Sequence, residues 1–499
     1  MLKYLSAYHA YYRVKNMTRT SEIEENRGNR RITVSLGADV SEGYVLRYEL
    51  HPAEHFTFTA MALGLETPQQ LGERLAAQVI ATLDEKKEQP DRIACDLYPK
   101  SPTTYAAEVL AEHYQVPMLR IQKCHRAILD AMDASVPSEA AGESDASASV
   151  LGICLDDLSY GSDGTLWGGE ILEISGEGFT RLASIHPYQL IGTNMELHSS
   201  TPWQTAVSML YDLARMAHNE DEAIRDFVAK QAASEKVHLL DLCSLNDARA
   251  QYIAQDRNKN TTRSTAASGL FDAAAAILGF QRISTPTGRT PMEALTEAAE
   301  AFEQQVVSGS TEPYVENDLH GSTDIRNAAQ SEMNGCAERD RKSFVLRGKY
   351  KAQIDALYAK LEKLIATAEE MDDPTLEPGD LWEDTDDGAF SETSADDHPD
   401  ILHTEQLIRL LADERIRYLT SLGKRNYDHP LNRKHPDAGS ADDNSLLLAW
   451  FLLDALATIC VQYCRSREGS NIVLSGDYLK TGMLKNRFEQ CPLRSAQHP

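Results

Sequence analysis

The chain has 499 residues, of which 42% are hydrophobic and 25% charged, fractions typical of globular domains rather than of a disordered chain. Its formal net charge of −27 repels phosphate backbones and argues against a nucleic-acid partner. The eight cysteines include no CxxC pair, so the sequence predicts buried thiols in a reducing compartment and no zinc ribbon.

The N-terminal lead-in, residues 1–30, has no long apolar core of the kind that a secretory signal needs. The most apolar stretch is residues 446–461, which contains Asp454 and is short for a membrane span. We therefore expect a buried helix there, no membrane partner and a cytoplasmic location.

The next part, residues 31–135, has the alternating and amphipathic patterns of a first α/β lobe. We expect, in chain order, strands at 31–40, 43–50 and 56–63, a helix at 68–83, a strand at 92–99, a helix at 103–113 and a strand at 116–122.

After a small, polar linker at residues 136–149 the strand pattern begins again, and we assign residues 150–368 to a second α/β lobe with helical additions. Strands are expected at 149–157, 165–175 and 179–188, with helices after Pro202. Residues 369–400 are rich in Asp and Glu and are predicted to be a disordered insertion. Residues 401–499 then supply helices at 402–422 and 445–463 and a closing strand and turn.

The most informative motif lies at residues 155–170, where a strand delivers Asp156 into a glycine-rich turn that contains Gly161, Asp163 and Gly164. Glycines let backbone amides approach an anion, and a carboxylate at a strand end can hold a cation. The motif predicts a metal–phosphate site, although a β-hairpin with an acidic turn would have the same pattern.

Two further segments have the layout of a phosphate cradle. Gly269 lies at the start of a helix whose free amides would face a phosphate, and Asp272 follows, where it would meet a ribose hydroxyl. Ser475 and Gly476 form a turn between a strand and a helix. An Ala-rich packing helix and an ordinary turn are the structural alternatives.

A histidine, His125, follows a predicted strand and opens a helix. A lone histidine in such a position is more often structural than a metal ligand.

These segments, in this order, resemble the C-terminal carbamoyl-transfer domain of the HypF-type hydrogenase maturation carbamoyltransferases. The resemblance rests on residues 32–40, 92–113, 116–132, 155–172, 179–192, 264–280 and 472–487. It implies two ribonuclease-H-like lobes of the actin-like ATPase fold around a nucleotide cleft.

The resemblance also implies ATP or carbamoyl-adenylate as the bound nucleotide, held by Gly161, Asp163, Gly164, Gly269, Asp272, Ser475 and Gly476. It implies one divalent metal ion (zinc, iron or magnesium) on Asp156, with His125 as a weak second ligand. The carbamoyl group would pass to the C-terminal cysteine of a partner maturation protein, and Asp156 and His125 would be the catalytic residues.

Several positions depart from the family pattern. The two metal-binding histidines of the family, four residues apart, align with Lys123 and Ala127, and its phosphate-side lysine and asparagine align near Ser41 and Glu42. The family's last metal-binding aspartate lies beyond the segment that matches. An ammonium group cannot replace an imidazole as a metal ligand unless it loses its proton.

The sequence is compatible with two main functions. One is a divergent carbamoyltransferase that receives an adenylate made elsewhere and transfers its carbamoyl group to a thiol or hydroxyl. The other is a non-catalytic relative that serves as a nucleotide- or protein-binding accessory factor. A kinase of the same fold is a third and less favoured alternative.

Overall fold

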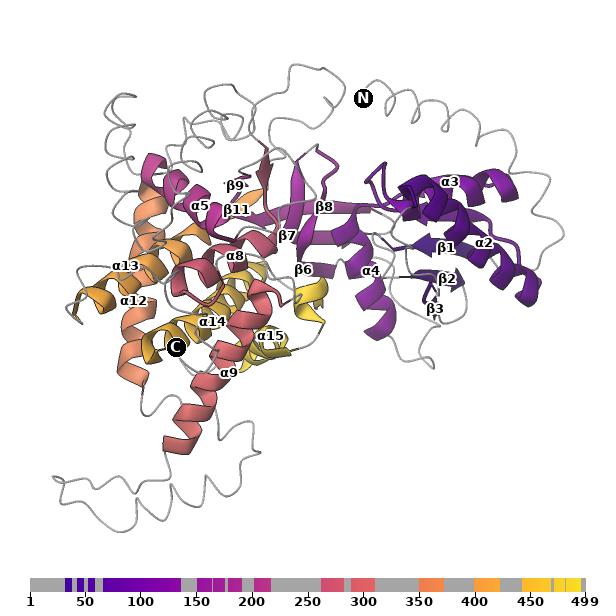
Figure 1. Cartoon of the computed structure of the whole chain (residues 1–499). Helices are drawn as coiled ribbons and strands as arrows, with labels where there is room; N and C mark the ends of the chain where they lie inside the picture. The colour runs from indigo at the N-terminus through magenta and orange to yellow at the C-terminus, as the bar shows by residue number, and fades with distance from the viewer. Residues whose placement is uncertain are drawn as a thin grey trace, which may run out of the picture. The chain divides into compact units, whose positions relative to one another are not determined.

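The computed structural model describes residues 32–37, 43–48, 53–58, 66–135, 150–163, 165–175, 178–190, 202–216, 262–281, 289–309, 350–371, 399–421, 442–467, 471–480 and 482–494. They form a mixed α/β fold, as the sequence predicts (Figure 1). The lead-in, the linker at 136–149, most of the acidic tract, Ser41, Glu42 and Gly164 lie outside these residues. The ribonuclease-H-like arrangement of lobes stays a prediction.

The chain divides into two compact units. The first contains Met1–Ser184, Pro374–Asp400 and Gly469–Asp477, and the second contains Ile185–Asp373, Ile401–Glu468 and Tyr478–Pro499. The predicted lobe boundaries stay predictions, and each unit is described by itself below.

The first unit begins with a five-stranded sheet in the order β3-β2-β1-β4-β5. Its elements are β1 (Ile32–Leu36), β2 (Tyr44–Tyr48), β3 (Glu54–Phe56), α2 (Pro68–Lys86), β4 (Arg92–Cys95), α3 (Pro102–Tyr114) and β5 (Met118–Arg120). The predicted hairpin is confirmed, because β1 and β2 pair antiparallel with Val34 opposite Leu46. The third strand, β3, begins two residues before its predicted position.

Helices α2 and α3 pack against each other and against this sheet (Figure 1). Leu36, Leu46 and Ile93 of the sheet share one buried core with Leu75 and Leu110 of the helices. Side-chain caps fix where the helices begin. Thr67 forms a reciprocal capping box with Gln70, and Ser101 accepts a hydrogen bond from the amide of Thr104.

The same unit contains α4 (Lys123–Ser135), β6 (Val150–Tyr160), β7 (Leu166–Ser175), β8 (Gly178–Ile185) and β12 (Asn471–Ser475). Strands β6, β7 and β8 pair antiparallel in succession, while β12 joins the other edge of β6 in parallel. Helix α4 packs on β6, β7 and β12, where Cys124 and Ile128 meet Cys154 and Trp167 in one core.

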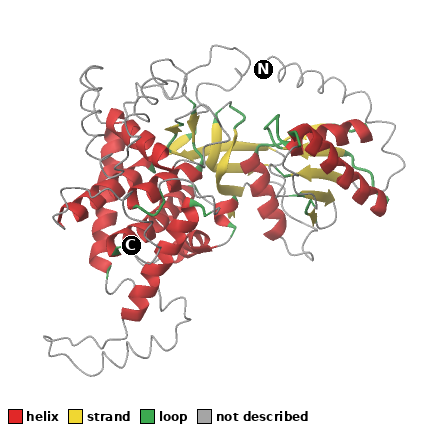
Figure 2. Ribbon diagram, in the orientation of Figure 1, coloured by secondary structure: helices red, strands yellow, loops and turns green. Residues whose placement is uncertain are grey.

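The second unit is mostly helical (Figure 2). It contains β9 (Tyr188–Gln189), α5 (Pro202–Met216), β10 (Arg263–Ser264), α8 (Ala267–Leu278), α9 (Pro291–Gly309), α12 (Lys351–Met371), α13 (Glu405–Ser421), α14 (Asp443–Arg465) and α15 (Gly482–Arg494). The chain passes between the two units within β11 (Asp400–Leu402) and within the short helix η7 (Asp477–Leu479). Helix α12 continues to Met371 and so includes the first three residues of the predicted acidic insertion.

Helix α14 is the core helix of this unit. Among the described residues it alone is long and apolar enough to cross a membrane, but 83% of its most apolar window is buried inside the protein. This burial confirms the helix predicted at residues 446–461 as a packed core element.

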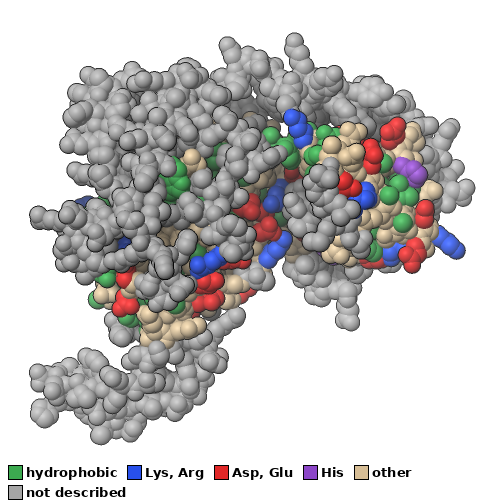
Figure 3. Space-filling model, in the orientation of Figure 1, with side chains coloured by type: hydrophobic (Ala, Val, Ile, Leu, Met, Phe, Trp, Pro, Cys, Tyr) green, Lys and Arg blue, Asp and Glu red, His purple; other side chains and the backbone are tan. Residues whose placement is uncertain are grey.

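On the face shown in Figure 3, acidic and basic side chains of the described residues are interspersed.

Candidate functional site

The candidate site of the first unit lies where the parallel strands β6 and β12 run side by side. Ser475, the last residue of β12, pairs with Cys154 of β6, so the residues that follow each of them meet at the same edge. These are Asp156 on β6 and Gly476 after β12. Only β12 ends here, because β6 continues past Asp156 to Tyr160, with an irregular register between Leu155 and Ser159. The carboxyl end of a parallel strand is a usual position of ligand sites in α/β sheets, so the end of β12 beside Asp156 is the strongest site candidate.

The glycine of the turn is required by the close approach of the two backbones. Gly476 has a φ of +87°, and a Cβ added there would lie 2.3 Å from the carbonyl oxygen of Leu155. The Ser475 hydroxyl donates to the Ile153 carbonyl oxygen at 3.3 Å and is buried. Of the predicted site residues, the structure therefore brings Asp156, Ser475 and Gly476 together.

Asp156 is paired with Lys123 rather than with a histidine. Lys123 Nζ lies 2.9 Å from Asp156 Oδ1, and the two side chains are 11% and 2% exposed. The same carboxylate oxygen accepts a hydrogen bond of 2.7 Å from the amide of Asp157. Burial raises the pKa of Asp156, the charge of Lys123 lowers it, and the nearby charge of Asp477 raises it again.

A second buried carboxylate, Asp96, lies just after β4, and sequence reasoning did not single it out. Its Oδ2 atom accepts a hydrogen bond of 3.2 Å from the amide of Tyr98. Burial raises its pKa, and the charges of Arg126 and Lys123 oppose this shift. Lys123 therefore acts electrostatically on two buried carboxylates, Asp96 and Asp156.

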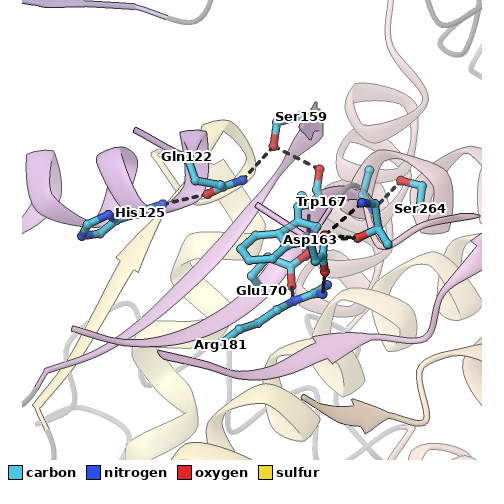
Figure 4. Close-up of polar contacts among 12 residues, drawn as sticks. Gln122, His125, Ser159, Asp163, Trp167, Glu170, Arg181 and Ser264 are labelled. Carbon is cyan, nitrogen blue, oxygen red and sulfur yellow. Dashed lines mark hydrogen bonds and ion pairs between the residues drawn. The ribbon is translucent and has the colours of Figure 1, made fainter. Parts of the chain in front are cut away.

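The imidazole of His125 is buried against Phe179, with ring centroids 4.7 Å apart. Its Nε2 atom has no hydrogen-bond partner among the described residues, and burial lowers the pKa of the ring. The backbone of His125 begins a polar chain drawn in Figure 4, in which its amide donates to Gln122 Oε1 at 3.0 Å. Gln122 Nε2 in turn donates to Ser159 Oγ at 3.1 Å. The role of His125 as a metal ligand stays a prediction.

Asp163 is the centre of the turn between β6 and β7. Its Oδ1 accepts hydrogen bonds from the amide and hydroxyl of Thr165 and from the indole of Trp167. Its Oδ2 accepts one of 2.8 Å from Arg181 (Figure 4). A Cβ added at Gly161 would lie 2.2 Å from the Trp167 indole nitrogen. These contacts give both residues a structural role in the hairpin, while their predicted contact with phosphate stays a prediction.

The two glycines that follow Trp167 donate backbone hydrogen bonds to a buried carboxylate. Glu170, whose side chain is fully buried, accepts from the amides of Gly168 and Gly169 and from Arg181 Nε at 2.7 Å. The Arg181 guanidinium also lies over the Trp167 ring, 4.1 Å from its centroid. Sequence reasoning missed Glu170 and Arg181, because the only local signal is a glutamate in an otherwise apolar strand.

The residues at this edge do not fit the expected divalent metal. Among the described residues, no three His, Cys, Asp or Glu side chains form a group that could hold a metal ion. Asp156 is occupied by an ammonium and an amide, and Ala127 offers no donor atom. Zinc requires several His, Cys, Asp or Glu ligands, and magnesium requires a carboxylate that no other cation occupies.

Gly269 and Asp272 belong to the second unit, on helix α8. The helix begins after Ala266, which provides no side-chain cap, so its first amides are not satisfied in that way. A Cβ added at Gly269 would lie 2.0 Å from the Tyr188 hydroxyl, and Asp272 is 5% exposed. Close packing therefore accounts for Gly269, and the meeting of Asp272 with Asp156 and Ser475 stays a prediction.

The second unit also holds a buried carboxylate between two histidines. Glu405 Oε2 lies 3.2 Å from His186 Nδ1, and its Oε1 lies 3.2 Å from His403 Nδ1. Burial raises the pKa of Glu405, but the charges and hydrogen bonds of the histidines outweigh it, so that the pKa lies below its usual value. A cavity with room for about one water molecule adjoins His186, Glu405 and Asp212.

Part of this chain is similar to known carbamoyltransferases. Residues 152–370 match the family model described as the second subdomain of the Kae1-like domain of carbamoyltransferases. A carbamoyltransferase HypF homolog of Cupriavidus necator is 31% identical over 200 residues, which are 40% of this chain and 43% of that protein. The carbamoyltransferase HypF of a Synechocystis strain is 27% identical over 226 residues, 45% of this chain and 26% of that protein.

Among solved structures, HypF of T. kodakarensis is 16% identical with a TM-score of 0.48, and the match covers 93% of this chain and 44% of that one. Full-length HypF in its phosphate- and nucleotide-bound form gives a TM-score of 0.37 at 17% identity, over 88% of this chain and 56% of that one. The matches span less than half the length of these two curated relatives.

Proposed function

Because this chain is related to the HypF-type carbamoyltransferases, we propose that it is a carbamoyltransferase of the hydrogenase maturation type. It would pass a carbamoyl group from carbamoyl-adenylate to a thiol or hydroxyl of an acceptor. The acceptor implied by the family resemblance is a partner protein with a C-terminal cysteine. The observation that carries the proposal is the family match over residues 152–370, which includes the whole hairpin after Asp156.

The strand-end geometry of the first unit supports the proposal. Gly476 brings its backbone against Leu155, beside Asp156, which leaves the amides of a glycine turn next to a buried carboxylate. Such turns bind phosphate through their amides. In the proposed reaction Ser475 and Gly476 form the phosphate-side turn, and Asp156 with Lys123 fixes the charge beside it.

Helix α8 of the second unit, taken by itself, is a further candidate element for binding phosphate. Its N-terminus has no side-chain cap, the amide of Gly269 donates to the Ala266 carbonyl oxygen at 3.2 Å, and the partial positive charge of a helix start favours a phosphate. Asp272, one turn further along α8, would accept a hydrogen bond from a ribose hydroxyl.

The chemistry asked of the protein is acyl transfer. The acceptor sulfur or oxygen attacks the carbamoyl carbon, the bond from that carbon to the adenylate phosphate breaks, and AMP leaves with the electron pair. The acceptor's proton goes to a base or to water. The protein's share is to orient the two reactants and to stabilise the charge on the leaving phosphate.

Nucleotide titration of the purified full chain tests the proposal. We expect ATP and a non-hydrolysable carbamoyl-adenylate analogue to bind in isothermal calorimetry, and the variant Gly476→Val to weaken binding at least tenfold. The matched control is Asp355→Asn on the exposed face of α12, which should bind as the wild type does. Circular dichroism of each variant would check that it is folded.

Transfer itself is tested with carbamoyl-adenylate and a peptide that ends in cysteine. Mass spectrometry of the peptide should show a carbamoyl adduct that depends on the protein. A folded chain that binds nucleotide but never modifies the peptide would favour the accessory-factor function, whereas a folded chain that binds no nucleotide would refute the proposal.

The accessory-factor function is the second candidate. It is favoured by the replacement of the expected metal-ligand positions by Lys123 and Ala127. It predicts a stable complex with a protein partner and no turnover.

A further inference from the structure

The buried contact between Lys123 and Asp156 bears on which cation this site uses. Nζ lies 2.9 Å from Oδ1, and the lysine is held on helix α4, which packs on both β6 and β12. We propose that the ammonium group of Lys123 takes the place of a divalent metal ion, so that the site carries a cation built into the chain. This inference concerns the site of the proposed function. It rests on that function in one respect, which is the expectation that a metal would bind there.

The fold holds Lys123 in place, and its side chain is not a flexible one on the surface. The lysine is the first residue of α4, and the next residue, Cys124, is fully buried in the core that this helix shares with β6 and β7. The lysine side chain is 11% exposed and its partner 2%. A buried ammonium is stable only when it is paired, and here the partner is the carboxylate that a metal would need.

The charges around the pair are consistent with a tethered cation. Asp156 and Asp477 are close enough for the charge of one to raise the pKa of the other, and Lys123 lowers the pKa of both Asp156 and Asp96. The ammonium therefore offsets charge on more than one buried carboxylate. A divalent ion bound to Asp156 would lie beside this ammonium and be repelled by it.

The remaining ligand positions also disfavour a metal. Ala127 lies one helical turn after Lys123, on the same face of α4, and it packs against the core that includes Trp167. His125 lies on the same helix, but its ring contacts Phe179. Two imidazoles at 123 and 127 would remove the ammonium beside Asp156 and add two nitrogen donors one helical turn apart on α4.

The test is metal binding by the full chain, read without any transfer assay. We would measure wild type, Asp156→Asn and the double variant Lys123→His/Ala127→His. Elemental analysis would give the zinc, iron and magnesium content of each protein. A titration with Co²⁺ would report binding through the visible absorption of the bound ion. We expect substoichiometric metal in the wild type. We expect the double variant to bind Co²⁺ at least tenfold more tightly than wild type, and Asp156→Asn in that background to abolish most of the gain.

A matched control is available on helix α12, where Lys351 and Asp355 are four residues apart and exposed. Lys351→His/Asp355→His places the same histidine pair on a helix with no Asp156 beside it. It should bind Co²⁺ more weakly than the double variant on α4. This comparison separates the contribution of Asp156 from that of any pair of histidines one turn apart.

Two results would overturn the proposal. One is a wild-type chain that binds a stoichiometric divalent metal and loses it on Asp156→Asn. The other is a double variant that is folded by circular dichroism but binds Co²⁺ no better than wild type. Should the double variant not fold, the wild type and Asp156→Asn decide the question alone. Nucleotide binding and transfer are separate measurements, so failure of the proposed function would be distinguished from failure of this inference.

Discussion

Arg181 holds the buried carboxylate of Glu170, with Nε 2.7 Å from Oε2 and the two side chains 8% and 0% exposed. The guanidinium also pairs with Asp163 and covers the face of Trp167. One arginine on β8 thus joins the turn, the aromatic ring and the buried strand of a hairpin that lies within the family match.

We expect Arg181→Met to lower the free energy of unfolding by about 3 kcal/mol, because it leaves Glu170 buried without its cation. Urea unfolding followed by circular dichroism and tryptophan fluorescence would measure the loss. The control is Arg417→Met, an arginine whose side chain is 62% exposed in an ion pair with Glu414 and whose loss should cost less than about 1 kcal/mol. Equal losses in the two variants would contradict the structural role of Arg181.

Substitutions at Gly476 and Gly279 would distinguish the cost of backbone strain from the cost of a steric clash. Both have positive φ, +87° and +84°, but a Cβ at Gly476 would meet the Leu155 carbonyl oxygen at 2.3 Å, whereas one at Gly279 would meet nothing within 4 Å. We expect Gly279→Ala to cost about 1 kcal/mol, the cost of the left-handed conformation. Gly476→Ala should cost at least about 2 kcal/mol more, because backbone must move. Comparable denaturation midpoints for both variants would show that β12 and β6 are less tightly apposed than the structure has them.

The elements of the fold followed from local pattern. Alternation of apolar residues predicted the β1–β2 hairpin, and the amphipathic run after Thr67 predicted α2. The predicted helix at 68–83 extends in the structure to Lys86, whose successor, Lys87, adopts a left-handed C-cap conformation. Sequence periodicity does not encode this last turn, because the residues there are all polar.

The family resemblance led us to expect Asp156, Ser475 and Gly476 at one site, but local pattern alone could predict the site only where neighbours in sequence are also neighbours in space. The turn with Asp163 and Gly161 could be found because its partners lie within a few residues. The pairs Lys123–Asp156 and Glu170–Arg181 could not, since they join different elements 33 and 11 residues apart along the chain. Their formation depends on how α4 and β8 pack, and no local pattern reports such packing.

The buried thiols give a prediction of pH dependence. Burial raises the pKa of Cys95 and of Cys464 to about 12, against about 8.5 in an unfolded chain. Because the folded chain binds these protons more tightly, the stabilisation is fully present below about pH 8.5 and is lost as the pH rises toward 12. Denaturant midpoints measured between pH 7 and pH 10 should therefore fall, and Cys95→Ser/Cys464→Ser should flatten that fall.

The same thiols should resist modification in the native state. The six cysteines among the described residues form no disulfide with one another and are all buried. In a Cys243→Ser/Cys336→Ser background, which removes the two other cysteines of the sequence, Ellman's reagent at pH 8 should label no thiol rapidly until urea is added. Rapid labelling of the folded protein would contradict the burial of these residues.

A double-mutant cycle measures how strongly Lys123 and Asp156 depend on each other. Lys123→Met removes the cation beside the buried carboxylate of Asp156, and Asp156→Asn removes the carboxylate closest to the buried ammonium, so each should cost about 3 kcal/mol. The double variant removes both charges and should be more stable than the sum predicts, by about 2 kcal/mol. The comparison pair is Lys360 and Glu414, which are 2.7 Å apart but 40% and 13% exposed, and its coupling should stay below about 1 kcal/mol. Strict additivity at Lys123 and Asp156 would mean that the two charges do not depend on each other in solution, and the case for a built-in cation would lose its energetic basis.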